Sequence, residues 1–188
     1  VYYGDDRTLD SLSVWDLRRR QVIVRLPPGT VPVGRVTFSA DGRRVAVVSG
    51  DWSIHLFDLP SGQPSRRLSS STPIDAIALR PDGRQLAVSS LAGHAVQVWD
   101  LETGRVIRVL PHPDVVYGLA WSPDGRRLAT GCHDRGVRVW DVASGRQLQA
   151  MQGHQEPPVR VAFNLDGSLL ASTSWDASVR LWDPNRGR

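Results

Sequence analysis

The sequence lacks lysine altogether and contains a single cysteine, Cys132, in 188 residues. One cysteine excludes an internal disulfide framework and favours a cytoplasmic location over an oxidising compartment. Long apolar runs are also missing, since none approaches the roughly 20 residues that a membrane-spanning helix needs. The sequence does not open with a basic segment followed by an apolar one, so we expect neither a secretory leader nor a membrane partner.

Positive charge comes entirely from arginine. The 23 arginines outnumber the 19 acidic residues, which gives a net charge of +4. The use of arginine alone is typical of an arginine-rich proteome, and we expect a bacterial source. A surplus of this size permits an acidic partner without requiring one.

Two independent markers repeat along the chain with the same period. Asp-Gly pairs stand at 41–42, 82–83, 124–125 and 166–167, at steps of 41, 42 and 42 residues. Pairs of an aromatic residue and aspartate end at Asp16, Asp58, Asp100, Asp141 and Asp183, at steps of 42, 42, 41 and 42 residues. A shared period of this length predicts a repeat protein.

Each period consists of short β-type segments separated by turns. Around Asp124-Gly125, the alternating segment VYGLAWS precedes the pair, RRLATGC follows it, and GVRVWD ends on the aromatic residue and aspartate. A weaker fourth segment follows a Ser-Gly or Thr-Gly turn. Four short strands per period are the unit of a β-propeller blade, in which each sheet covers the next.

The chain resembles the WD-repeat (tryptophan–aspartate repeat) β-propeller family over essentially its whole length, most closely in residues 153–183, GHQEPPVRVAFNLDGSLLASTSWDASVRLWD. The resemblance implies an all-β fold of four-stranded antiparallel blades. It also implies a hydrogen-bonded tetrad of histidine, a hydroxyl or its substitute, aspartate and tryptophan in a blade. By this resemblance, the tetrad positions in successive repeats are Ser49 and Asp51; Ser90 and Trp99; His112, Cys132, Asp134 and Trp140; and His154, Ser174, Asp176 and Trp182.

We expect one propeller region over 1–188, with about four and a half blades. Residues 1–31 correspond to the outer part of a preceding blade, and 32–72, 73–114, 115–156 and 157–188 form successive blades, the last incomplete. Because relatives usually close with seven blades, we expect an open arc from a larger propeller. Both ends of such an arc leave strands unpaired, so self-association through open blade edges is the alternative.

Cys132, His133 and Asp134 stand side by side and raise the question of a thiol nucleophile or a zinc site. Successive side chains on a strand point to opposite faces, so Cys132 and His133 diverge and no activated thiol is expected. A structural zinc site needs four ligands, whereas the chain has one cysteine and five dispersed histidines. We therefore predict no catalytic residue, no metal site and no cofactor.

Ten arginines are expected on one face of the disc, in the turns that join first to second and third to fourth strands. This turn face holds Arg18, Arg19, Arg20, Arg43, Arg44, Arg84, Arg105, Arg126, Arg127 and Arg146. Aspartates in the same turns dilute the charge, and no aromatic residues interleave with it, which argues against a nucleic acid. Binding of a polyanion or nucleic acid by this face stays an alternative.

The opposite face, here called the loop face, holds the loops that lead into each blade and the turns between second and third strands. Its candidate partner-binding residues are Arg35, Trp52, Asp75, Tyr117, His133, Arg160 and Trp175. Exposed aromatic and arginine side chains are frequent contact anchors. We therefore predict a non-enzymatic interaction scaffold for a protein or peptide partner. A regulatory or sensory propeller within a larger multidomain enzyme, such as a bacterial kinase or protease, is a further alternative.

Overall fold

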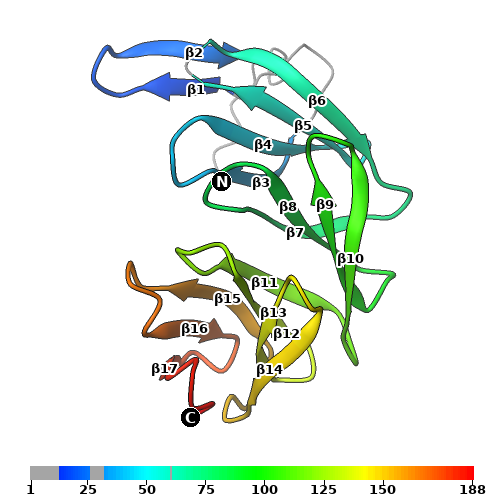
Figure 1. The fold of residues 1–188 in the computed structure, drawn as a ribbon, viewed down its shortest axis with the longest axis vertical. Coiled ribbons are helices and arrows are strands. Elements are labelled where there is room, and N and C mark those ends of the chain that lie inside the picture. Colours follow the sequence, from blue (N-terminus) through cyan, green and yellow to red (C-terminus); the bar gives the residue numbers. More distant parts are fainter. Residues whose placement is uncertain (1–12, 26–31, 60) are drawn as a thin grey trace.

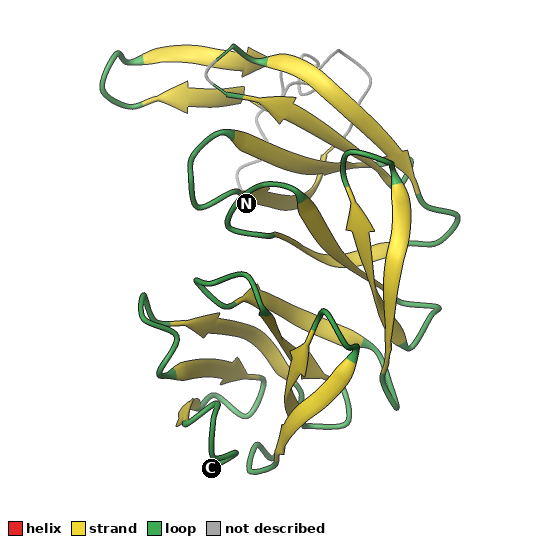
Figure 2. Cartoon of the chain, viewed as in Figure 1, coloured by secondary structure: helices red, strands yellow, loops and turns green. Residues whose placement is uncertain are grey.

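A computed structural model describes residues 13–25, 32–59 and 61–188 of the chain (Figure 1). Every regular element in these ranges is a strand (Figure 2). The same ranges contain no helix that is long and apolar enough to cross a membrane. Predictions for residues 1–12 and 26–31, within the expected remnant of a preceding blade, fall outside the described residues.

The strands form five antiparallel sheets within the described ranges. A two-stranded sheet contains β1 (Ser13–Asp16) and β2 (Gln21–Arg25). Three four-stranded sheets contain β3 (Pro32–Phe38), β4 (Arg44–Ser49), β5 (Ser53–Asp58) and β6 (Gln63–Ser69); β7 (Ile74–Leu79), β8 (Gln85–Ser90), β9 (Ala95–Asp100) and β10 (Arg105–Pro111); and β11 (Val116–Trp121), β12 (Arg127–Cys132), β13 (Val137–Asp141) and β14 (Arg146–Met151). A three-stranded sheet contains β15 (Pro158–Phe163), β16 (Leu170–Ser174) and β17 (Val179–Trp182).

The Asp-Gly pairs close the first hairpin of the four larger sheets, and the turn before β12 shows how. Ser122 Oγ donates to Asp124 Oδ1 over 2.5 Å and accepts the backbone N–H of Arg127 over 2.9 Å. Gly125 has a φ of 67°, a left-handed conformation that costs glycine little and most other residues more. Ser122, Asp124 and Gly125 therefore fix where β11 ends and β12 begins.

The hydrophobic core lies between consecutive sheets. Val137 and Val139 on β13 are fully buried because Leu170 and Trp182 of the next sheet pack against them. Similar clusters fill the other junctions, and Figure 1 shows the sheets following one another along an arc from β1–β2 to β15–β17. The predicted all-β fold of four-stranded antiparallel sheets is confirmed, while a larger propeller stays a prediction.

Arginine side chains also link consecutive sheets by bonding to the Asp-Gly turn of the next one. The donor in each pair is a guanidinium N–H, and the acceptor is the carbonyl oxygen of the turn glycine, 2.9 Å away in all three. The pairs are Arg44 with Gly83, Arg80 with Gly125, and Arg127 with Gly167.

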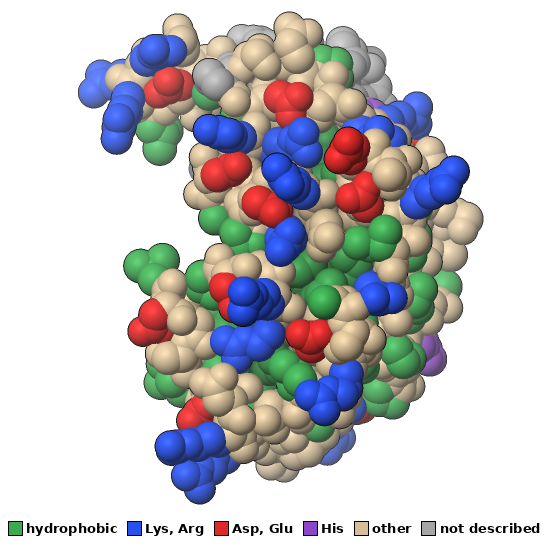
Figure 3. All heavy atoms as spheres, viewed as in Figure 1, with side chains coloured by type: hydrophobic (Ala, Val, Ile, Leu, Met, Phe, Trp, Pro, Cys, Tyr) green, Lys and Arg blue, Asp and Glu red, His purple; other side chains and the backbone are tan. Residues whose placement is uncertain are grey.

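Because of these bonds, two of the arginines predicted on the turn face are not free to bind a partner. The sequence places Arg44 and Arg127 on an open, charged face, but both are only half-exposed and are engaged with the neighbouring sheet. Figure 3 further shows arginine and acidic side chains interspersed over the visible surface. The turn face therefore offers a polyanion fewer free arginines than the sequence suggests.

Candidate interaction site

The last sheet contains a tetrad whose hydroxyl group differs from the predicted one. His154 Nε2 lies 2.7 Å from Ser172 Oγ, and Trp182 Nε1 donates to the same oxygen over 2.8 Å. His154 Nδ1 lies 2.9 Å from Asp176 Oδ2. The predicted Ser174 donates instead to the carbonyl oxygen of Glu156 over 2.7 Å. The assignment of Ser174 is wrong by two residues.

The preceding sheet shows the same difference. His112 Nε2 lies 2.9 Å from Thr130 Oγ1, and Trp140 Nε1 donates to that hydroxyl over 3.3 Å. Cys132, predicted in the hydroxyl position, donates its thiol to the carbonyl oxygen of Asp114 over 3.3 Å. Cys132 in this sheet and Ser174 in the last one therefore occupy equivalent positions, and each donates to a backbone carbonyl oxygen. The prediction that Cys132 belongs to the tetrad is wrong.

Asp134 is also used differently from Asp176. Its carboxylate accepts hydrogen bonds from Arg138 Nη1, over 2.9 Å, and from Arg138 Nη2. His112 Nδ1 lies instead 2.9 Å from the carbonyl oxygen of Leu110. Burial lowers the pKa of His112 to about 4, so its ring is neutral at physiological pH.

The first two complete sheets have no hydroxyl at the Ser172 position, because Val47 and Val88 stand there. In consequence, Trp99 Nε1 is buried without a hydrogen-bond partner among the described residues. The predicted Ser90 does not supply one.

In the sheet that contains Val47, an aromatic ring without an N–H group, Phe57, takes the tryptophan position. Ser49 and Asp51 form a different cluster there, since Ser49 Oγ donates to Asp51 Oδ1 over 2.5 Å and lies 2.7 Å from Ser53 Oγ. Ser53 Oγ also lies 2.8 Å from His55 Nε2.

Cys132, His133 and Asp134 do not form a reactive group. Burial raises the pKa of the Cys132 thiol to about 11, which keeps it protonated. His133 Nδ1 lies 2.9 Å from Asp114 Oδ2, and Asp134 pairs with Arg138. In the ranges that the structure describes, no three His, Cys, Asp or Glu side chains are grouped so as to hold a metal ion.

On the loop face, three first strands carry a β-bulge near their start. The pairing register shifts between Ile74 and Ala76, between Val116 and Gly118, and between Pro158 and Arg160. The residues left unpaired by these shifts are Asp75, Tyr117 and Val159. A bulge redirects the side chain of the extra residue, and bulges are frequent next to functional sites.

The three bulge residues line one cavity of about 470 Å³. Its remaining lining residues are Arg35, Arg160 and Trp175. The structure therefore brings together five of the seven residues predicted to bind a partner.

Of the other two predicted residues, His133 packs edge-on against Tyr117 beside the cavity, with ring centroids 5.9 Å apart. Trp52 lies outside the cavity in the β4–β5 turn, where its φ is 61°.

Both charged and aromatic side chains line this cavity. Arg35 Nη2 lies 3.1 Å from Asp75 Oδ1, and Arg35 Nε donates to the carbonyl oxygen of Asp75. The rings of Tyr117 and Trp175 lie 5.2 Å apart, and Trp175 is 60% exposed. Burial is the main cause that raises the pKa of Tyr117, so its phenol stays protonated and able to donate.

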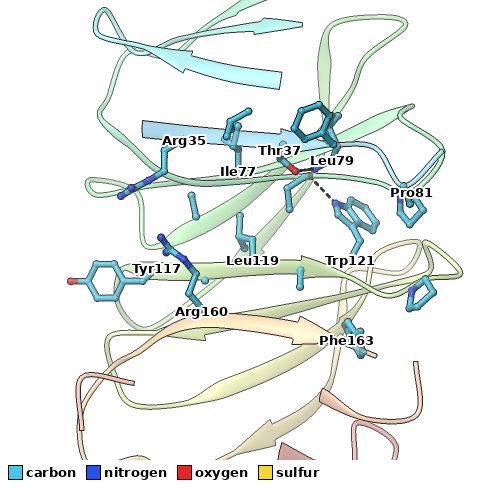
Figure 4. Close-up of a pocket in the computed structure, with 18 of the residues that line it drawn as sticks. Arg35, Thr37, Ile77, Leu79, Pro81, Tyr117, Leu119, Trp121, Arg160 and Phe163 are labelled. Carbon is cyan, nitrogen blue, oxygen red and sulfur yellow. Dashed lines mark hydrogen bonds between the residues drawn. The ribbon is translucent and has the colours of Figure 1, made fainter. Parts of the chain in front are cut away.

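The cavity continues into a groove of about 510 Å³ along the first strands β3, β7, β11 and β15 (Figure 4). Gly118 permits this arrangement, because a Cβ atom there would lie 3.2 Å from Arg160 Cα on the neighbouring strand. The groove was not predicted from the sequence, and its lining includes Val36 and Phe38 of β3 and Leu119 of β11. Only the packing of consecutive sheets reveals that these strands share one surface.

Comparison with known proteins agrees with this geometry. Residues 21–58, 104–141 and 145–183 match the WD40 family, described as WD domain, G-beta repeat. Each matched segment ends at the end of the third strand of a sheet or one residue after it. The repeat that ends at Asp100 is not among the matches, and it belongs to the sheet in which Trp99 lacks its acceptor. No curated protein matches the chain. The matched segments cover more than half of the residues, and the chain belongs to the WD40 repeat family.

Proposed function

We propose that this chain is a non-enzymatic scaffold that binds a peptide or protein partner through the cavity of the loop face. WD40 repeat domains are typically interaction scaffolds and are generally non-catalytic. The proposal adds the place at which this particular chain binds, formed by Arg35, Asp75, Tyr117, Arg160 and Trp175.

The observation that carries the proposal is the convergence of bulge residues from three sheets. Asp75, Tyr117 and Val159 occupy equivalent positions in their repeats, yet they differ in charge, size and polarity. A repeated backbone that presents different side chains at one place can select a ligand without changing its fold. Trp175 contributes a largely exposed aromatic ring next to them, the type of residue that often dominates binding energy.

The test is selection of binding peptides from a displayed random library, followed by titration of the selected peptides against variants. Trp175→Ala should weaken their binding by about tenfold or more, as expected for the loss of an aromatic anchor. Fluorescence anisotropy with labelled peptides measures this change.

Trp15→Ala is the matched control. Trp15 lies on β1, is 55% exposed and is absent from the cavity lining. Its substitution removes the same side chain at a similar exposure and should leave binding unchanged. Peptides that bind both variants and the wild-type chain equally well would refute the proposed site, and so would a library that yields no peptide above background.

A further inference from the structure

The cavity of the loop face carries more positive than negative charge. Arg35 and Arg160 line it together with one carboxylate, that of Asp75. Figure 4 shows the side chains of Arg35 and Arg160 at the same end of the groove, beside Tyr117. Two guanidinium groups against one carboxylate leave a positive surplus, and guanidinium groups form strong hydrogen bonds with carboxylates.

Arg35 is held in place by the protein itself. Its Nε and Nη2 bond to Asp75, and its Nη1 has no hydrogen-bond partner among the described residues. Because a guanidinium group has five N–H donors, several remain available to a ligand. Fixing them in advance lowers the entropic cost of binding.

Arg160 supplies the second cation with fewer internal contacts. Its Nη1 donates to the neighbouring carbonyl oxygen of Val159 over 3.0 Å, and the residue is otherwise exposed. Its charge is therefore not neutralised by a carboxylate among the described residues.

Away from this charged end, the groove is mostly apolar, with Thr37 and Asn164 as its polar lining residues. Val36 and Phe38 on β3 are 49% and 51% exposed, and Ile77 and Leu119 line the surface beside them. Figure 4 shows Pro81, Trp121 and Phe163 at the end opposite to Arg35 and Arg160. The first strands run along the groove for six or seven residues each, which corresponds to roughly 20 Å.

From this distribution of charge and apolar surface we infer that the partner is an extended peptide with an acidic side chain at one end and apolar side chains after it. The acidic side chain binds between Arg35 and Arg160, and the apolar side chains lie along Val36 and Phe38. About six extended residues match the length of the groove. The inference rests on the proposed function and adds the chemistry of the partner.

The test is a comparison of peptides selected from the same displayed library by the wild-type chain and by Arg160→Glu. The wild-type chain should select Asp or Glu at one end, followed by Leu, Phe or similar residues. Arg160→Glu reverses the charge and should bind these acidic peptides at least tenfold more weakly, while it selects Lys or Arg at that position. Arg35→Gln is a second variant, expected to weaken acidic peptides without selecting basic ones.

Arg146→Glu is the matched control, because it makes the same charge change at an exposed arginine of the turn face. It should keep the wild-type preference, which separates local recognition from the effect of net charge. Peptides that depend on Trp175 but show no acidic preference would overturn this inference and leave the proposed scaffold function intact. Selection of basic peptides by the wild-type chain would also overturn it, whereas a lack of Trp175-dependent peptides would overturn both.

Discussion

Four repeats place valine, valine, threonine and serine at the position of Ser172, and only the last two give the neighbouring aromatic ring a hydrogen-bond acceptor. Ser172 and Thr130 accept the indole N–H of Trp182 and Trp140. Val88 leaves the N–H of Trp99 unpaired among the described residues. A buried polar group without a partner costs about 1–3 kcal/mol.

Val88→Thr and Val47→Thr should therefore differ in their effect on stability. Each substitution places a hydroxyl group at a buried position, but only at Val88 is an unpaired indole N–H present to donate to it. We expect Val88→Thr to stay within about 1 kcal/mol of the wild-type free energy of unfolding, whereas Val47→Thr, beside Phe57, should lose about 1–3 kcal/mol. Urea denaturation measures both, and equal losses would contradict the assignment of this position.

His112 gives the stability of the fold a defined dependence on pH. Its folded pKa of about 4, lowered by burial, lies below the value of about 6.5 expected in the unfolded chain. Protonation therefore favours the unfolded state. The contribution of His112 to stability is complete above about pH 6.5 and declines as the pH falls towards 4, with a loss of about 2 kcal/mol at pH 5.

The prediction is that His112→Gln removes this part of the pH dependence. The decrease in the free energy of unfolding between pH 7.5 and pH 5 should be about 2 kcal/mol smaller in the variant than in the wild-type chain. His94→Gln, which alters an exposed histidine, should retain the full decrease. A variant His112→Gln that lost stability over this range as steeply as the wild-type chain would show that His112 does not titrate as proposed.

Residue spacing identified the histidine and tryptophan of the last two sheets and Asp176 of the last one, but neither of the two hydroxyl groups. Ser172 and Ser174 lie two residues apart, and side chains two residues apart share one face of a strand. Alternation therefore cannot choose between them. Which of the two serines bonds to Trp182 depends on the register between β16 and β17. In that register Trp182 pairs with Leu170 and Arg180 pairs with Ser172, so Ser172 is the serine nearer to Trp182 along β16.

At the scale of elements, the strands and turns were predictable and the contacts between sheets were not. Asp-Gly pairs specify hairpin turns through local conformation, so they mark strand ends in the sequence itself. The bond from Arg127 to Gly167 depends on how two sheets pack, and an arginine in a turn otherwise resembles any solvated surface residue. The groove between Arg35 and Arg160 was missed for the same reason.

Arg127 should contribute more to stability than its neighbour Arg126. Arg127 donates to Gly167 and to Asn185 Oδ1, both over 2.9 Å, and its guanidinium carbon lies 5.5 Å from the centroid of the Phe163 ring. Arg127→Ala should lose about 1–3 kcal/mol. Arg126→Ala alters an exposed side chain and should stay within about 0.5 kcal/mol of wild type. Thermal or urea denaturation measures both changes. Equal stability of the two variants would show that the contacts of Arg127 do not stabilise the fold.

At the scale of the whole molecule, the last sheet exposes an apolar face, and the corresponding face of the preceding sheet is buried. Val137 and Val139 on β13 are fully buried by the next sheet, while the corresponding Val179 and Leu181 on β17 are 67% and 63% exposed. Full burial of a valine or leucine side chain is worth about 1.5–3 kcal/mol. An exposed apolar surface beside an edge strand favours association with another sheet.

We therefore predict that the 188-residue chain self-associates through β16 and β17. Sedimentation velocity should show an average mass that rises with concentration for the wild-type chain, and the double substitution Val179→Thr with Leu181→Lys should reduce this rise. The double substitution Ile107→Lys with Val109→Thr is the matched control, since it changes apolar residues of β10 that are 41% and 56% exposed outside the core clusters. It should associate as the wild-type chain does. A wild-type chain that sediments as a monomer at every concentration would show that the exposed face of β17 does not recruit a second copy.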